Sequence, residues 1–530
     1  MTATETHSPG TGSAGTGTLG TTGSGFPATG ADGSGGSGSG TTTVDTLIVG
    51  TGFAGIGAAV RLLQDQRTDF VVLERASDVG GTWRDNTYPG CRCDVPSHLY
   101  SFSFAPNPYW SETFSPQPEI FAYLRKVATD FGVLPHIRWN HDVSDASWNA
   151  EEERWVVTTS GGRFRAKFLI LGTGALVEPL IPDLPGLGDF QGKVMHSARW
   201  DSSYDLTGKR VAVIGTGASS IQIVPSIQPR VAELTLFQRT PAWIVPHPGR
   251  SVRRWEQRLF AALPASQRLA RAAVYFSREL AVLAFVKYPK LMKAGAKQAA
   301  KHLESQVPDP ELRRQLTPHY EMGCKRVLPS NEFYPALSKP NVRLVTDAIA
   351  GLDRDGVITA DGTHHDVDVV IWGTGFHVTD NPMARLVHGR DGHTLSEIYD
   401  GDLSAYLGTS IPYFPNLVMM TGPNTGLGHS SMVFMIESQL NYVLEGRRQL
   451  EAEGLDVYEV REEVANSYNA DLQRALPDTV WGSGCSSWYL DKKGRNITLW
   501  PDFTFVFRRK AQKFDPTEHV IGKSKTRVDA

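Results

Sequence analysis

The sequence predicts an α/β fold built from two strand–turn–helix–strand units and a helical insert. In the first unit, residues 44–49 form an apolar strand, residues 50–55 form a glycine-rich turn that opens a helix, and Phe70–Leu73 form the next strand. Strands that are apolar along their whole length are typical of parallel sheets covered on both faces. The unit therefore predicts a sheet with helices on each side.

A second unit repeats this pattern later in the chain. Arg210–Ile214 predict a strand, residues 215–220 a turn, residues 221–227 the start of a helix, and Glu233–Phe237 the following strand. The two units resemble each other, and this is the internal similarity of the chain. No tandem repeat of solenoid type is present.

Three further segments complete the predicted architecture. Residues 168–174 and 369–375 are apolar strands that end in glycine-rich turns, as expected where a sheet delivers the chain to a ligand. Between residues 251 and 322, apolar residues recur at spacings of three and four with Arg and Glu between them. That period predicts a helical insert that packs on the second unit.

Composition excludes several classes of protein. The 530 residues have a formal net charge of -3, without the basic stripe that a nucleic-acid binder needs. Four cysteines are too few for a disulfide scaffold and suit a reducing compartment. Cys91 and Cys93 lack the further ligands of a zinc site, so no metal is expected. Without a signal peptide or an apolar run that could span a bilayer, a cytoplasmic protein with no integral membrane segment is expected.

The first glycine-rich turn predicts a dinucleotide site. Gly50 makes the tight turn, Gly52 lets the backbone approach a pyrophosphate, and Gly55 lets helix and strand pack closely. The helix N-terminus adds free N–H groups for the phosphates. Glu74 follows Gly50 by 24 residues, where a carboxylate accepts hydrogen bonds from ribose hydroxyls and repels a 2′-phosphate. This site therefore predicts FAD or NAD, and not NADP.

The second turn predicts a site of opposite ribose chemistry. Gly215 and Gly217 are followed by Ser220 where a third Gly or Ala is usual, and Ser is small enough for close packing. Arg239 again lies 24 residues after the first glycine, and Thr240 follows it. A cation beside a hydroxyl suits the 2′-phosphate of NADP. Two such sites in one chain indicate an enzyme that passes hydride from NADPH to FAD.

These sites define the predicted domains, two of them Rossmann-like. Residues 1–43 are almost all Gly, Ser, Thr and Ala and predict a disordered tail. Residues 44–180 form the first part of the FAD-binding domain, and residues 181–368 form the NADP-binding domain, which contains the helical insert at about residues 251–322. Residues 369–530 return to the FAD-binding domain and end in a C-terminal loop region.

A motif between the two units resembles a known family. Phe190, Gly192, His196 and Trp200, followed by Asp201, match FxGxxxHxxxW with Pro or Asp after it. This pattern resembles the fingerprint of the Baeyer–Villiger monooxygenases, whereas the related flavin-containing monooxygenases carry Tyr or Phe in place of the Trp. The resemblance implies that His196 and Trp200 couple the motion of the domains and take no part in the chemistry.

A second signature of the same family comes earlier in the chain. Gly80-Gly81-Thr-Trp83, then Tyr88-Pro-Gly, then Asp94 resemble it in full, and the likeness extends over roughly residues 44 to 510. It implies that Trp83 and Asp94 lie at the cofactor. It also implies the reaction, in which NADPH and O2 convert a ketone to an ester or lactone through a C4a-peroxyflavin. Linear, cyclic, aromatic and steroid-sized ketones are all candidates, and any oligomeric state is open.

The resemblance also assigns the catalytic residues. The stretch GCKRVLP resembles the family segment in which Arg326 stabilises the peroxide anion and Lys325 lies toward NADP, while Asp94 positions the arginine. Arginine suits the role because it keeps its charge when desolvated. The glycine-rich residues 421–431 resemble a loop that returns to the flavin, and Trp488 resembles a tryptophan that closes over NADP.

Three alternatives remain at this point. A flavin-containing monooxygenase would form S-oxides or N-oxides, but Trp200 and the pair Asp94 and Arg326 weigh against it. A flavin disulfide reductase would need a CxxC motif, and Cys91 and Cys93 are one residue too close for that. A flavin-binding module without activity would not need Arg239.

Overall fold

The computed structural model describes residues 40–523. The predicted tail lies outside the described residues, apart from its last few. Thr41 to Thr43 belong to the first strand, because they pair in parallel with Arg163 to Arg165. The strand predicted at residue 44 therefore starts three residues earlier.

The first sheet has eight strands, with the predicted βαβ unit at its centre. Seven follow the order β17-β4-β5-β6-β1-β2-β3, and β18 pairs with β6. Those nearest the centre, β6, β1, β2 and β18, run parallel. The strands are β1 Thr41–Val49, β2 Phe70–Leu73, β3 Ile137–Arg138, β4 Val143–Asn149, β5 Arg154–Thr159, β6 Gly162–Leu171, β17 Val387–His388 and β18 Leu417–Met419.

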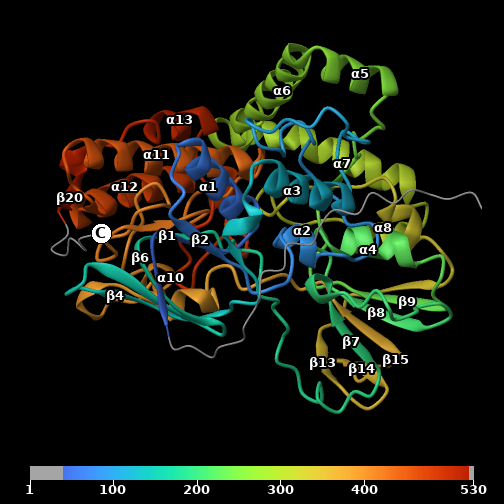
Figure 1. The fold of residues 1–530 in the computed structure, drawn as a ribbon. Coiled ribbons are helices and arrows are strands. Elements are labelled where there is room, and N and C mark those ends of the chain that lie inside the picture. The colour runs from blue at the N-terminus through green and yellow to red at the C-terminus, as the bar shows by residue number, and fades with distance from the viewer. Residues whose placement is uncertain (1–39, 524–530) are drawn as a thin grey trace, which may run out of the picture. The chain divides into compact units, whose positions relative to one another are not determined.

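The chain returns to this sheet after building the second one, since β17 and β18 come last in sequence. Helices pack beside it in Figure 1, with α1 next to α11 and α11 next to α13. They are α1 Phe53–Gln64, α2 Thr82–Asp85, α3 Gln117–Asp130, α10 Glu397–Asp400, α11 Met432–Ala452, α12 Glu462–Ala475 and α13 Thr504–Lys510. Strands β19 Val457–Val460 and β20 His519–Gly522 form a separate antiparallel pair.

The second sheet is parallel and has the order β12-β9-β8-β16-β7. Its strands are β7 Lys193–His196, β8 Arg210–Ile214, β9 Glu233–Phe237, β12 Val342–Val345 and β16 Val369–Trp372, and helices α4 Ser220–Ile227 and α9 Phe333–Leu337 accompany it. The predicted strands β8, β9 and β2 have the expected bounds. A three-stranded antiparallel sheet lies below the second parallel sheet in Figure 1. Its strands are β13 Ile349–Leu352, β14 Gly356–Thr359 and β15 His364–Asp366.

The insert is helical, as predicted. It contains α5 Arg254–Ala262, α6 Pro264–Glu279, α7 Met292–Gln306 and α8 Pro310–Gln315, with a short π-helix at Leu283–Lys287 and a 3-10 helix at Pro289–Leu291. Strand β10 Ile244–Val245 precedes the insert and strand β11 Leu328–Pro329 follows it. The two strands pair with each other. Figure 1 shows α5 and α6 as a hairpin at the edge of the molecule.

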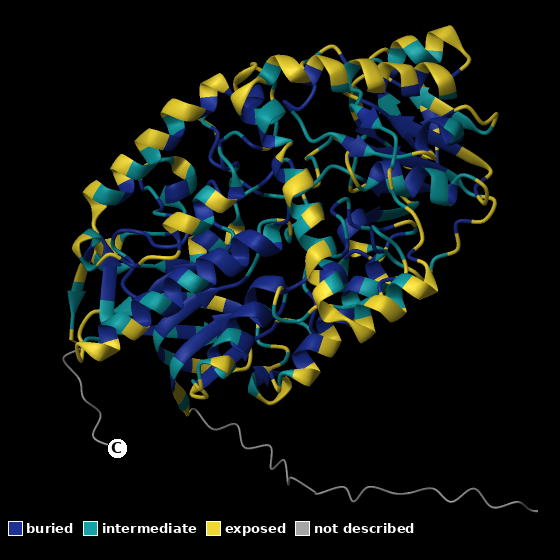
Figure 2. Cartoon of the chain, turned by 90° about the horizontal axis from the view of Figure 1, so that it is seen from above, coloured by how far each residue is buried: buried dark blue, intermediate teal, exposed yellow. Residues whose placement is uncertain are grey.

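Buried side chains concentrate in the sheets and the helices beside them (Figure 2). One large cluster includes residues of both parallel sheets, among them Ile48, Ile170, Val213 and Ile371. Of the helices that the structure describes, none is long and apolar enough to cross a bilayer.

Candidate active site

A cavity of about 1350 Å³ lies where both glycine-rich turns meet. Its lining includes Gly50 and Gly52 from the first sheet and Gly215 and Gly217 from the second. Most pockets for one small ligand measure roughly 300–1,000 Å³, so this cavity has room for more than one. The carboxyl ends of parallel strands are where ligands bind in such sheets.

The first turn has the geometry that a pyrophosphate needs. Gly50 has a φ of +97°, in the region that favours glycine, and a Cβ there would lie 2.7 Å from the Gly172 carbonyl oxygen. A Cβ on Gly55 would lie 1.8 Å from the Gly50 carbonyl oxygen, so Gly55 serves close packing and does not line the cavity. Helix α1 begins after Gly52 without a side-chain cap, which leaves its first N–H groups for an anion.

Glu74 follows β2 and lines the cavity, as the spacing predicted. Its two carboxylate oxygens already accept four hydrogen bonds. One accepts from the Thr51 backbone N–H at 3.1 Å and from the Thr51 hydroxyl at 2.5 Å. The other accepts from the Ala76 N–H at 2.9 Å and from Arg84 at 2.8 Å. A ribose hydroxyl must therefore share or displace one of these donors, and Arg84 is a residue that sequence reasoning missed.

The residues 421–431 reach the cavity, as the resemblance implied. Thr421 and Ser430 both line it, and each has a buried hydroxyl oxygen without a hydrogen-bond partner among the described residues. Buried polar groups are normally paired. The two hydroxyl oxygens are themselves buried, so they are unpaired groups within the cavity wall.

The second turn meets two cations that have no carboxylate partner. Arg239 and Lys325 line the cavity, and neither forms an ion pair with a carboxylate in residues 40–523. Burial lowers the pKa of Lys325, and the nearby charge of Arg239 lowers it further. Two uncompensated positive charges in one cavity fit a phosphate group. Thr240 lies beside them, and Ser220 packs against Gly373 behind the turn instead of lining the cavity.

Asp94 and Arg326 form a two-pronged ion pair across 232 residues of sequence. The arginine Nε and Nη2 each donate to a carboxylate oxygen at 2.7 Å. Burial alone would raise the pKa of Asp94, but the charge and hydrogen bonds of Arg326 outweigh it and lower the pKa. The charge of Asp94 in turn raises the pKa of Arg326. Both side chains keep part of their surface free toward the cavity, 31% for Arg326 and 22% for Asp94.

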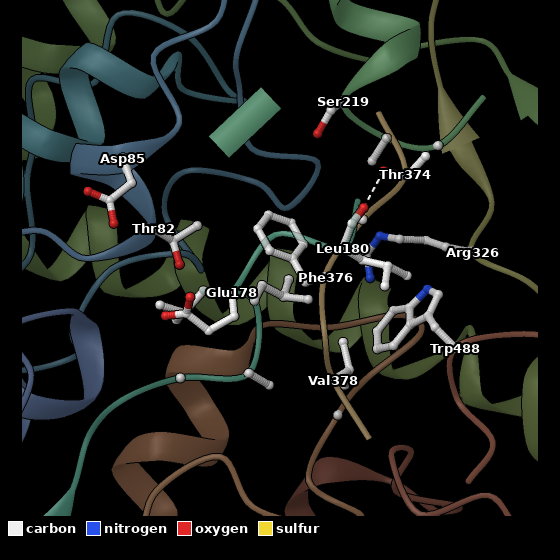
Figure 3. A pocket seen from close by; sticks show the side chains of 18 of the residues that line it. Thr82, Asp85, Glu178, Leu180, Ser219, Arg326, Thr374, Phe376, Val378 and Trp488 are labelled. Carbon is white, nitrogen blue, oxygen red and sulfur yellow. Dashed lines mark hydrogen bonds between the residues drawn. The ribbon is translucent and has the colours of Figure 1, made fainter. Parts of the chain in front are cut away.

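Trp488 shares this part of the cavity. It is 44% exposed and, in Figure 3, reaches into the pocket together with Arg326. Burial raises the pKa of the neighbouring Tyr489. Arg326 is close enough for its positive charge to act on that pKa as well. Trp83 also lines the cavity, and its indole N–H donates to the Tyr100 hydroxyl at 3.1 Å.

The fingerprint residues His196 and Trp200 lie away from the cavity lining. His196 ends β7, where it pairs with Trp372 of β16. Its Nδ1 accepts from the Ala198 N–H at 3.1 Å, and burial lowers its pKa to about 4. A neutral histidine between a strand and a loop suits a structural position more than an acid–base one.

Comparison with curated relatives shows the family of this chain. Residues 47–284 match the family described as pyridine nucleotide-disulphide oxidoreductase. A Baeyer–Villiger monooxygenase of Streptomyces coelicolor is 50% identical over 88% of this chain and 90% of its own. One of Pseudomonas aeruginosa is 46% identical over 88% and 89%. The chain belongs to the Baeyer–Villiger monooxygenases.

Solved structures of Baeyer–Villiger monooxygenases have the same fold. A closed cyclohexanone monooxygenase is similar with a TM-score of 0.81 and 28% identity, over 91% of this chain and all of the other. An oxidised steroid monooxygenase bound to NADP has a TM-score of 0.80 and 30% identity over the same shares. The predicted α/β fold with two Rossmann-like domains and the predicted family are therefore confirmed.

One pair of cysteines in this monooxygenase differs from expectation. Cys324 and Cys485 form a disulfide across 161 residues, although the low cysteine content suggested reduced thiols. The bond ties the residue two positions before Arg326 to the loop that carries Trp488. No spacing rule predicts such a pair, because the contact exists only in the folded chain. Cys91 and Cys93 are buried and free, as expected for ordinary small residues.

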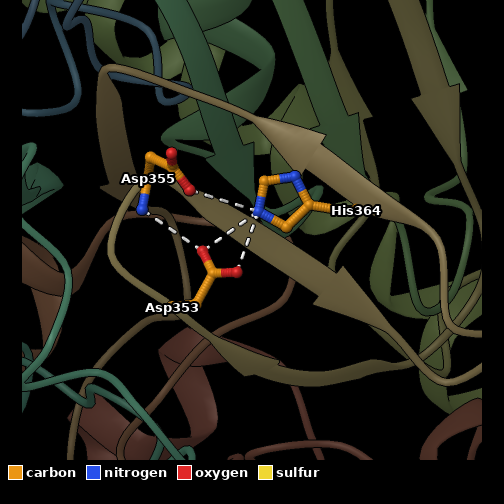
Figure 4. A group of neighbouring side chains, drawn as sticks. All are labelled: Asp353, Asp355 and His364. Atoms are coloured by element: carbon orange, nitrogen blue, oxygen red, sulfur yellow. Dashed lines mark hydrogen bonds and ion pairs between the residues drawn. The ribbon is translucent and has the colours of Figure 1, made fainter.

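One further cluster resembles a metal site but is explained by ion pairs. Asp353 and Asp355 lie in the turn between β13 and β14, and His364 begins β15, outside the cavity lining (Figure 4). His364 contacts Asp353 at 3.0 Å and Asp366 at 2.9 Å, and the hydrogen bond to Asp353 is the main cause of its raised pKa. These contacts pair the three side chains with groups of the protein itself.

Proposed function

We propose that this monooxygenase uses NADPH and O2 to convert ketones to esters or lactones. One oxygen atom of O2 enters the bond between the carbonyl carbon and a neighbouring carbon. The other leaves as water, and NADPH supplies the two electrons. The observation that carries the proposal is the Asp94–Arg326 pair, which opens on the same cavity as both glycine-rich turns.

FAD belongs at the first turn in this proposal. Gly50, Gly52 and the start of α1 hold its pyrophosphate, Glu74 holds its ribose, and Trp83 packs nearby. The chemistry supplied by bound FAD is acceptance of hydride from NADPH and activation of O2. We assign residues 44–180 and the residues after 372 to this domain, since β17 and β18 join the first sheet. Residues 369–372, which were predicted to belong here, form β16 and pair with β7 and β8 of the second sheet.

NADPH belongs at the second turn, in the domain of residues 181–372, which includes β16. The backbone at Gly215 and Gly217 holds its pyrophosphate. Arg239, Thr240 and Lys325 surround its 2′-phosphate. Trp488 covers the coenzyme from the C-terminal loop. His196 and Trp200 connect the strand β7 to the following loop and act on domain motion only.

Arg326 supplies a fixed positive charge where negative charge develops on the reacting oxygen. Asp94 fixes the guanidinium plane through two hydrogen bonds, so no reorganisation is needed during the reaction. Because the pKa of Arg326 is raised and that of Asp94 is lowered, both groups stay charged through the neutral range. A lasting positive charge favours a nucleophilic oxygen, which attacks carbonyl carbon, over the protonated form that gives S-oxides and N-oxides.

The location of the enzyme in the cell is a further part of the proposal. A cytoplasmic location, where NADPH is available, stays a prediction, and the Cys324–Cys485 disulfide weighs against a strongly reducing compartment.

Product analysis tests the proposed function. The purified enzyme with FAD is supplied with NADPH, isotopically labelled O2 and linear, cyclic, aromatic and steroid ketones in turn. We expect ester or lactone that carries one labelled oxygen. Oxidation of NADPH without ester from any ketone, together with S-oxide from a thioether, would overturn the proposal in favour of a flavin-containing monooxygenase.

A further inference from the structure

The helix α6 turns three polar side chains toward the protein, beside Val274 and Tyr275, and leaves large apolar side chains on its outer face. Gln267, Arg271 and Glu279 face the protein. Gln267 donates to the Asn107 carbonyl at 2.6 Å, and Arg271 donates to the Ser101 carbonyl at 2.9 Å. Glu279 is 4% exposed and accepts two hydrogen bonds from residue 504. These hydrogen bonds fix which face of the helix is buried.

The outward face of α6 is an apolar stripe. Leu269, Phe276 and Leu280 recur at helical spacing and are 73%, 64% and 65% exposed. A surface helix normally buries such a stripe in the core. Here the hydrogen bonds of the opposite face prevent that, so the stripe faces solvent.

Neighbouring segments extend this surface. Helix α5 has no buried residue, and it contributes Trp255 and Leu259, with Leu263 at the turn into α6. Tyr288 and Leu291 follow α6 and are also more than half exposed. We call these eight side chains the insert patch: Trp255, Leu259, Leu263, Leu269, Phe276, Leu280, Tyr288 and Leu291. So many large apolar side chains exposed on one insert mark a candidate interaction site.

The charge around the insert patch is strongly positive. Residues 251–306 contain eleven Lys and Arg against three Glu and no Asp, in a chain whose formal net charge is -3. Arg254, Arg258, Arg268 and Lys290 are exposed, and none of them forms an ion pair with a carboxylate of residues 40–523. The partner of this surface must therefore be both apolar and negatively charged.

We propose that the insert patch docks on an anionic lipid surface. Trp, Phe and Leu on helices flanked by Arg and Lys are the composition of helices that lie in the membrane interface. The apolar side chains enter the headgroup region while the cations contact lipid phosphates. Since no described helix spans a bilayer, the attachment is peripheral and reversible.

Two other occupants fit less well. A second copy of the chain would set the same positive surface against itself in a symmetric interface, where like charges repel. The chain's own residues 1–39 are mostly Gly, Ser and Thr and offer only Met1, Leu19 and Phe26 as large apolar side chains. Three apolar side chains cannot cover the eight side chains of the insert patch.

Vesicle sedimentation tests the proposal with the full-length, FAD-loaded enzyme. We expect binding to vesicles of equal parts phosphatidylcholine and phosphatidylglycerol, weaker binding in high salt, and little binding to phosphatidylcholine alone. A serine variant that carries Leu269→Ser, Phe276→Ser and Leu280→Ser should have a partition coefficient about tenfold lower for each side chain replaced. Arg258→Gln and Arg268→Gln should each lower it about fivefold.

Matched changes elsewhere on the surface serve as controls. Val520 is 51% exposed on β20 and Arg230 is exposed after α4, and neither belongs to the insert or to α13, which contacts α6 through Thr504. Val520→Ser and Arg230→Gln should leave vesicle binding unchanged. Flavin content and the rate of flavin reduction by NADPH report whether each variant is folded.

Four outcomes would overturn the proposal. They are no binding of the native chain to either vesicle, equal binding to both, undiminished binding of the serine variant, or a dimer in light scattering that the serine variant abolishes. The last would assign the insert patch to a second copy of the chain. None of these outcomes bears on the proposed reaction, because vesicle binding is measured without substrate.

Discussion

Replacing Arg326 by Ala should separate the chemical step from flavin reduction. The guanidinium donates two hydrogen bonds of 2.7 Å to Asp94 and turns its remaining surface to the cavity. A unit charge about 4 Å from a developing negative charge contributes roughly 4 kcal/mol at an effective dielectric constant of about 20. Loss of one preorganised donor usually slows a reaction by about 10² to 10³. We expect a fall in ester formation within that range.

Two measurements check this expectation. Stopped-flow absorbance follows flavin reduction by NADPH, which should keep its native rate, and product mass gives ester yield. Arg326→Lys should fall between native and Ala, because it keeps a charge but loses the two-pronged geometry.

Arg390 offers a matched control, since it also donates from Nε and Nη2 to one carboxylate, Glu459, at 2.8 Å, away from the cavity lining. Arg390→Ala should reduce stability without changing the ratio of ester to NADPH consumed. Native ester yield in Arg326→Ala would refute the assigned role.

Three further predictions concern the coenzyme, the disulfide and acid stability. Arg239→Ala should raise KM for NADPH about ten- to a hundredfold and leave KM for NADH unchanged, since a hydrogen bond to a charged group contributes about 1.5–3 kcal/mol; an equal rise for both coenzymes would remove Arg239 from the 2′-phosphate. Cys485→Ser should weaken NADP binding in titration calorimetry and lower stability by about 2–4 kcal/mol, whereas unchanged affinity would mean that the disulfide does not hold the loop. Burial lowers the pKa of His519 from 6.5 to about 4, so the unfolded chain binds a proton that the folded one does not between these pH values. The free energy of unfolding should fall by about 3 kcal/mol as pH decreases through that window, and His519→Asn should flatten the dependence of Tm on pH.

Local sequence patterns predicted the parts of the site that depend on backbone geometry. Gly50, Gly55 and Gly215 were found from spacing because their roles are steric and are encoded within one strand–turn–helix unit. Glu74 and Arg239 were found because a βαβ unit sets the distance from its turn to the end of its second strand.

Contacts between distant segments were not predictable in the same way. The hydrogen bond from Arg84 to Glu74 and the Cys324–Cys485 disulfide follow no spacing rule. Asp94 and Arg326 were paired only through the family resemblance. Helical period predicted α6 but not its orientation, because the period identifies a stripe without saying which face finds hydrogen-bond partners.

Three consecutive residues connect the halves of the cavity. Cys324 is bonded to the loop of Trp488, Lys325 lies beside Arg239 at the second sheet, and Arg326 holds Asp94 from the first sheet's loops. The strand β11 follows directly and pairs with β10, so this segment is anchored to the backbone after β9. Any movement of the coenzyme side relative to the flavin side must therefore strain one of these contacts. In the proposed function the same short segment carries one residue for the coenzyme and one for the reaction, so a residue inserted between Lys325 and Arg326 should disturb chemistry and coenzyme binding together.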